Sequence, residues 1–229
     1  MDSKQKIQDA ANAIISFSDP CTYNKERKQI EQSESESAHY ITEVSSSLQT
    51  LGVQIQMNES CNSVTQIPKL LRSLITLSLY KIRIHFNKEV DQLMLTLRGR
   101  SRECLCWIQY YSDAQVQSEL VKVGYGRVIF LSLSTAGGIG EEHDKEICNG
   151  LSFISWFLRA LHEGRNKDYQ PSFQPLPLLA RRSEEQLEEE GANEEVEAQM
   201  INKREGYYDI KYWANCTKAE ILNHFIHSN

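Results

Sequence analysis

Two short patterns in the chain bring metal-ligating side chains close together. Cys104 and Cys106 are separated by one residue, and His224 and His227 are three residues apart. On a helix the two cysteines point in different directions, and no second cysteine pair stands at the spacing of a zinc site. The two histidines share a helix face, yet no third ligand is evident. We therefore expect no metal site and no cofactor, and we interpret the cysteines as core or surface side chains.

A glycine-rich segment, residues 137–140, would suit phosphate binding if it followed a strand and opened a helix. No strand is predicted before it, and the carboxylates of Glu141 and Glu142, which follow it, repel phosphate. His143 and Asp144 come next, but no serine or cysteine nucleophile lies near them in sequence. The chain thus shows no recognisable catalytic group of residues, and we predict that it is not an enzyme.

The charged side chain with the clearest chemistry is Arg127. Residues 123–131 combine a glycine turn, this single arginine and an apolar run that predicts a buried helix. Glycine lets the backbone turn tightly and lets another helix approach closely. The guanidinium is expected to stay at the rim of the buried helix, where it can bind a partner's carboxylate. The alternative interpretation is a surface arginine that caps the helix or pairs internally.

The composition gives no sign of nucleic-acid binding. The chain has 229 residues, of which 40% are hydrophobic and 24% charged, and its net charge is −6. One short acidic stretch supplies much of the negative charge, so the remainder is close to neutral and has no basic face. We interpret that stretch as a solvated face or a flexible spacer. Its glutamates are Glu184, Glu185, Glu188, Glu189, Glu190, Glu194, Glu195 and Glu197.

No targeting segment is predicted. The first residues lead into a polar amphipathic segment and not into the apolar core of a signal peptide. No run of 18 or more apolar residues exists, so we expect no transmembrane anchor. The six cysteines are scattered and are predicted to be free thiols in a reducing compartment. These observations favour a cytoplasmic protein.

Hydrophobic periodicity predicts an all-α protein, a helical bundle in which a buried central helix near residues 126–137 is wrapped by amphipathic helices. Residues 80–86 alternate like a strand, but a helix is favoured there because no second strand is available to pair with it. Gly99 is expected to break the pattern, and Gly164 to end a helix. The predicted helices are 4–18, 38–57, a segment from 70 to 97, 101–121, a helix from Arg127 to about 135, 144–162, an acidic helix or disordered segment at 183–204, and a last helix within 206–227.

We predict two domains, with a boundary at the proline-rich segment that contains Pro171, Pro175 and Pro177. Residues 1–174 form the helical domain, which includes a flexible loop at about 19–37. Residues 175–229 form an acidic, aromatic C-terminal extension. Its aromatic residues could dock on the core or bind a partner, and they are Tyr207, Tyr208, Tyr212 and Trp213.

The segment Gly124-Tyr125-Gly126-Arg127-Val128-Ile129 resembles the first homology motif of the Bcl-2 family of apoptosis regulators. That motif is usually written Asn-Trp-Gly-Arg followed by an apolar helix. Here Tyr125 stands in place of the tryptophan and Gly124 in place of the asparagine. Leu131, Leu133 and the glycines at 137 and 138 continue the similarity, and the resemblance covers about residues 4–174.

A second segment resembles the third homology motif of that family, the death motif. The motif needs four apolar residues on one helix face, a small residue for close packing, and an aspartate that pairs with the groove arginine. Gly52 supplies the small residue, whereas Val53 stands where the aspartate is expected. The apolar face is supplied by Val44, Leu48, Leu51 and Ile55.

The resemblance implies a Bcl-2-like fold and a regulator of apoptosis that acts by protein–protein interaction. A hydrophobic groove would accept the death-motif helices of other family members, and Arg127 would bind the ligand's aspartate while Gly126 permits close approach. Homo- or heterodimers, and contact with the mitochondrial outer membrane through partners, follow from the same resemblance. The residues expected to line or support the groove are Leu120, Tyr125, Val128 and Phe130.

A different class of function is a helical scaffold or adaptor without a groove. In that interpretation the acidic and aromatic C-terminal extension, which contains Tyr207, Tyr208, Tyr212 and Trp213, binds the partner.

Overall fold

The computed structural model describes residues 3–19, 34–58, 61–81, 86–134, 144–201 and 209–226. Throughout these residues the regular structure is α-helical, with one isolated antiparallel bridge between Arg165 and Phe173. The predicted all-α class is therefore confirmed. The chain folds as two compact units, Met1–Tyr111 and Ser112–Asn229, called here the first and second unit.

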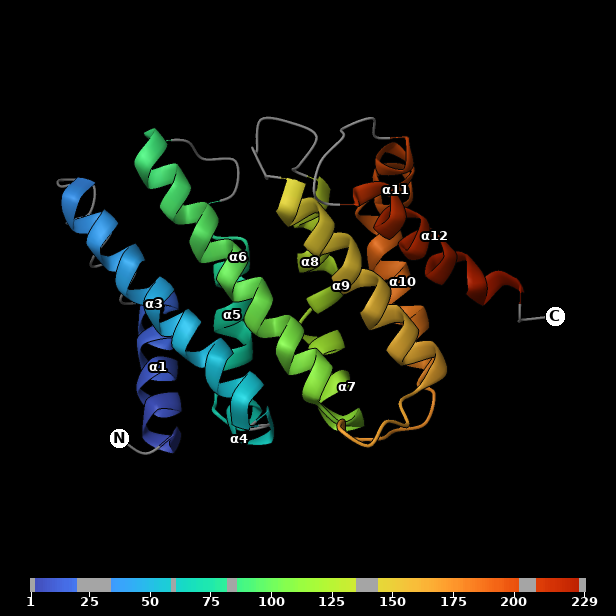
Figure 1. Cartoon of the computed structure of the whole chain (residues 1–229), viewed down its shortest axis with the longest axis horizontal. Helices are drawn as coiled ribbons and strands as arrows, with labels where there is room; N and C mark the ends of the chain where they lie inside the picture. The colour runs from blue at the N-terminus through green and yellow to red at the C-terminus, as the bar shows by residue number, and fades with distance from the viewer. Residues whose placement is uncertain are drawn as a thin grey trace. The chain divides into compact units, whose positions relative to one another are not determined.

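The first unit is built on two long helices, α3 (Glu34–Asn58) and α6 (Lys88–Tyr111), that lie side by side. In Figure 1 the helices α1 and α5 lie behind them, and each packs on one of the long helices. The shorter elements are α1 (Ser3–Ser18), α4 (Cys61–Thr65) and α5 (Leu70–Ser78). Helix α3 begins inside the segment predicted as a loop at 19–37, and residues 20–33 of that segment lie outside the described residues.

The segment predicted as one helix from 70 to 97 is two helices. Lys81 adopts a left-handed conformation with φ of 45° after the end of α5. The side chain of Asn87 then accepts a hydrogen bond from the backbone N–H of Val90 at 2.9 Å, which caps the start of α6. Gly99 does not break this helix and is buried inside it. Residues 82–85, where strand and helix were weighed, lie outside the described residues.

The apolar stripe of α3 faces α1 and α6. Leu48, Leu51 and Ile55 are fully buried, and Gly52 lies where α3 crosses α6. A Cβ atom built at Gly52 would lie 3.6 Å from the sulfur of Cys104, an ordinary van der Waals distance. The position therefore faces the neighbouring helix, although alanine would also fit there.

The second unit places α9 (Asp144–Glu163) in contact with both α8 and α12, and Figure 1 shows α12 next to α9. Helix α10 packs on α7, α8 and α9, and α11 packs on α8 and α12. The other helices are α7 (Ala114–Lys122), α8 (Tyr125–Ser134), α10 (Pro177–Glu189), α11 (Ala192–Met200) and α12 (Ile210–Ile226).

The C-terminal segment is part of this second unit, so the predicted boundary near residue 174 falls inside a compact body. The reason is a set of buried apolar side chains among the glutamates. Ala180 and Leu187 are buried seven positions apart on one face of α10, and Ala192 and Val196 are buried four positions apart on α11. The acidic stretch is helical in α10 and α11, which is one of the two alternatives that the sequence left open.

Candidate interaction surfaces

Arg127 lies in the first turn of α8, directly after the turn made by Gly124, whose φ is 81°. Its side chain is 59% exposed, and its Nε atom forms an ion pair with Oε1 of Glu190, just beyond the end of α10. The arginine therefore stays at the surface and holds a carboxylate, but the carboxylate belongs to the same unit. An exposed pair of this kind contributes about 0–1 kcal/mol.

The residues expected around Arg127 lie under it, in the core of the second unit. Tyr125 and Phe130 are completely buried, and the ring of Tyr125 meets the edge of Phe157 at a centroid distance of 4.9 Å. A Cβ atom at Gly126 would lie 3.5 Å from the same phenylalanine ring. These side chains support the α8 surface from inside and do not form an open trough. Leu120 and Val128 are buried with them.

The segment similar to a death motif lies on α3, in the first unit. Val44 and the three apolar residues that follow it on this face are buried against α1 and α6. Val53, at the position of the missing aspartate, is 41% exposed. Presenting this face to another protein would require α3 to leave its own core.

An exposed aromatic surface connects α9 and α12. We call Phe153, Trp156, Tyr212 and Trp213 the aromatic patch. Trp156 and Trp213 meet edge to face at 5.5 Å, and the ring of Tyr212 lies 5.2 Å from that of Trp213. Tyr212 is 56% exposed and Trp156 is 37% exposed, so two large rings face the solvent.

The sequence singled out only half of this patch. Tyr212 and Trp213 were named, whereas Phe153 and Trp156 were not singled out. Spacing contains a usable signal, because Lys145, Asn149, Phe153 and Trp156 share one helix face on which polar and aromatic residues follow one another. Tyr207 and Tyr208, named with them, lie outside the described residues.

Polar contacts hold the two helices beneath the aromatic patch. Arg159 of α9 donates to Glu220 of α12 at 2.7 Å, and the hydroxyl of Thr217 donates to the backbone carbonyl of Leu151 at 2.8 Å. Glu220 and Thr217 are buried, so the contacts are protected from water. A hydrogen bond with Cys216 raises the pKa of the Tyr212 hydroxyl above its ordinary value of about 10, at which a phenol is already neutral at physiological pH. The patch is thus a neutral aromatic surface on a fixed pair of helices.

Two of the described thiols are held in the neutral form by burial. Burial raises the pKa of the Cys104 thiol to about 12, and burial also raises that of Cys148. Cys104, Cys106, Cys148 and Cys216 form no disulfide. Among the described residues no three histidine, cysteine or acidic side chains are grouped to hold a metal ion. None of the described helices is long and apolar enough to cross a membrane.

Comparison with known proteins gives no relative for this chain. Its sequence matches no family model, and no curated protein and no solved structure is significantly similar to it. Function must therefore be argued from the surfaces described above.

Proposed function

We propose that the chain is a helical adaptor that binds a partner protein through the aromatic patch on α9 and α12. The observation that carries the proposal is the exposure of Trp156 and Tyr212 on two helices that are fixed to each other. Tryptophan and tyrosine are enriched at the centres of protein interfaces, because they bury much area at low entropic cost.

The distribution of exposed apolar side chains supports this proposal. Of the ten large hydrophobic side chains that are exposed in the described residues, three lie on the neighbouring helices α9 and α12. Isolated apolar side chains on a surface are ordinary, whereas a group of them marks a binding site. The three are Trp156 on α9, and Tyr212 and Leu222 on α12.

The ring geometry supports a protein surface as the partner. An aromatic cage for a methylated ammonium needs room for the cation between the ring faces. Here Trp156 and Trp213 are perpendicular and already in contact, as are Tyr212 and Trp213, so the rings leave no space between them. The patch instead offers a continuous ridge of rings to the apolar surface of a protein.

The test is a double substitution, Trp156→Gln with Tyr212→Gln, in the full chain. Loss of two aromatic anchors is expected to weaken binding of the partner captured by the wild-type protein at least thirtyfold, since truncation of a hot spot costs about 2 kcal/mol or more. Binding is measured by biolayer interferometry with the purified partner. Both positions are exposed, so the melting temperature is expected to change little.

The matched control is Leu178→Gln on α10, which removes an equally apolar side chain that is 82% exposed and remote in sequence from the patch. This variant is expected to bind as the wild type does. Equal loss in the control, or undiminished binding in the double variant, contradicts the adaptor proposal.

A second candidate function is favoured by the ion pair between Arg127 and Glu190. In this alternative the chain regulates apoptosis by binding amphipathic death-motif helices at α8, as members of the Bcl-2 family do. The carboxylate of Glu190 pairs with the guanidinium of Arg127 in the way that a ligand's aspartate would. Because an exposed pair is worth about 0–1 kcal/mol, an incoming helix could displace it.

Arg127→Glu is expected to abolish measurable binding of a death-motif peptide, while Glu190→Gln, which frees the guanidinium, tightens it severalfold. Both substitutions are at the surface, so folding should be retained. Isothermal titration calorimetry of the three proteins with one peptide measures the effect. Identical affinities for the wild type and Arg127→Glu exclude this alternative.

A further inference from the structure

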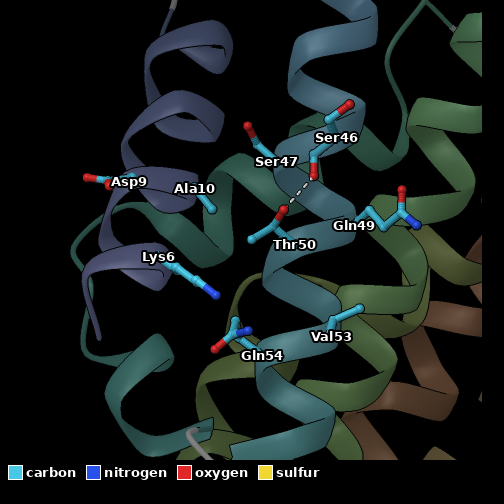
Figure 2. Close-up of a pocket in the computed structure, with 9 residues that line it drawn as sticks. All are labelled: Lys6, Asp9, Ala10, Ser46, Ser47, Gln49, Thr50, Val53 and Gln54. Carbon is cyan, nitrogen blue, oxygen red and sulfur yellow. Dashed lines mark hydrogen bonds between the residues drawn. The ribbon is translucent and has the colours of Figure 1, made fainter. Parts of the chain in front are cut away.

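A hollow of about 700 Å³ lies between α1 and α3 in the first unit. Figure 2 shows small side chains along its α3 wall and Ala10 on the α1 side. Lys6 extends from α1 into the hollow toward Gln54, whereas the carboxylate of Asp9 points away from it. Asp9 also accepts a hydrogen bond from the side chain of Gln5 at 2.7 Å. The ammonium of Lys6 is therefore the charge directed into the hollow.

The hydroxyl groups on the α3 wall already donate to their own helix. Ser46 donates to Thr42, Ser47 to Glu43 and Thr50 to Ser46, at 3.0–3.1 Å from the carbonyl oxygens. These side chains consequently offer few free donors to a small polar ligand. What they provide is low bulk, which lets the backbone of another segment approach α3 closely.

Lys6 lies close to the positive end of a helix dipole. Within its described residues, helix α1 has no acidic residue in its first turn, and Lys6 stands near its N-terminus, where the dipole is already positive. A lysine in that position is unfavourable for the helix. Within the described residues no ion pair involving Lys6 is present. A negatively charged partner would compensate both the dipole and the lysine.

We propose that the hollow between α1 and α3 docks an acidic amphipathic helix of a partner protein, with one carboxylate of that helix bound to Lys6. Residues 46–54 extend about 12 Å along α3, which corresponds to roughly two turns of a docked helix. Val53 and Met57, which are 41% and 77% exposed, continue the same surface and provide apolar contacts for its uncharged face. This surface lies in the first unit and is separate from the aromatic patch of the second.

The test uses a display library of 14-residue amphipathic helices and the full-length chain as target. Selection is expected to enrich peptides that carry Asp or Glu at one fixed position. Lys6→Glu should weaken their binding tenfold or more, because a charge-assisted contact is replaced by repulsion. Thr50→Trp, at an exposed position, should weaken it similarly by filling the hollow.

The matched control is Lys88→Glu, which reverses an exposed lysine at the N-terminus of α6 in the same unit and should leave binding unchanged. Selected peptides that bind Lys6→Glu and Thr50→Trp as tightly as the wild type would overturn the proposal, as would a selection without enrichment. Displacement of the peptides by a single-stranded oligonucleotide at equal concentration would assign the site to nucleic acid and would also overturn it.

Discussion

Gly164→Ala is expected to lower the free energy of unfolding of the second unit by about 2–5 kcal/mol. Gly164 ends α9 with φ of 72°, a conformation that is unfavourable by about 1–2 kcal/mol for other residues. A Cβ atom there would lie 2.5 Å from the carbonyl oxygen of Phe173 and 2.8 Å from backbone atoms of Gln174 and Pro175. Because these are backbone atoms, relief requires movement of the chain, at about 1–3 kcal/mol more.

The clash is severe because hydrogen bonds hold the opposing segment, residues 173–175, in place. Arg165 and Phe173 exchange two backbone hydrogen bonds of 2.7 and 2.9 Å, and the N–H of Leu176 donates to the carbonyl of Leu161 at 2.8 Å. The guanidinium of Arg165 also lies over the ring of Phe173. This closed loop returns the chain onto α9 and starts α10, so it determines where Glu190 meets Arg127.

Gly124→Ala provides the matched control for this prediction. Gly124 has a similar φ of 81°, but a Cβ atom there would meet nothing within 4 Å. Its expected loss is therefore about 1–2 kcal/mol, from the backbone conformation alone. Urea unfolding followed by circular dichroism measures both variants. Equal losses at the two glycines would show that the loop after α9 is not closed as described.

Much of the fold was accessible from hydrophobic periodicity, and the errors have identifiable causes. The spacing of Ile7, Ala11, Ile14 and Ile15 predicted α1, and these side chains are buried except that of Ile15, which is half-buried. The break between α5 and α6 was missed because the run of leucines predicts one continuous helix, although Asn87 is a good helix cap. Asp113 gives the same signal at the start of α7, where its side chain accepts from the N–H of Val116 at 3.0 Å.

The predicted domain boundary near residue 174 lies inside the second unit, and the physical reason for this error is a different one. Prolines and a run of glutamates are typical of linkers, and composition dominated the prediction for residues 175–229. Burial depends on the few apolar positions at helical spacing within each helix. Leu187 of α10 and Val196 of α11 are buried in this way and pack the two helices onto the second unit. Pro177 begins α10 at a position where proline is favourable, so it starts a helix inside the unit.

At Arg127, the sequence predicted only the features that neighbouring residues in the chain determine. The exposure of Arg127 follows from a charge at the start of an apolar helix. Its partner Glu190 lies 63 positions along the chain, and no local pattern joins the two. The aromatic patch could not be found from the sequence for a similar reason. Helix α9 is apolar on several faces, and its packing against α8 and α12 determines that Trp156 stays exposed.

Phe157→Ala is expected to have the largest effect on the second unit, a loss of about 3–5 kcal/mol in the free energy of unfolding. Phe157 is completely buried on α9 and touches the ring of Tyr125 on α8, and a Cβ atom built at Gly126 would lie 3.5 Å from its ring. Truncation removes its transfer energy and leaves a cavity between the two helices. Phe157→Leu, which keeps most of the volume, should cost less than half as much.

The same measurement decides what the residues below Arg127 do. A ring that lined an open groove would be partly hydrated already, and its removal would cost little stability while it weakened ligand binding. A buried ring has the opposite signature, with a large stability loss. A double-mutant cycle of Phe157→Leu with Tyr125→Leu should give a coupling of about 0.5–1.5 kcal/mol, the usual value for an aromatic pair. A coupling near zero, together with a loss below 1 kcal/mol for Phe157→Ala, would reopen the groove at α8 and weaken the case for the aromatic patch as the main binding surface.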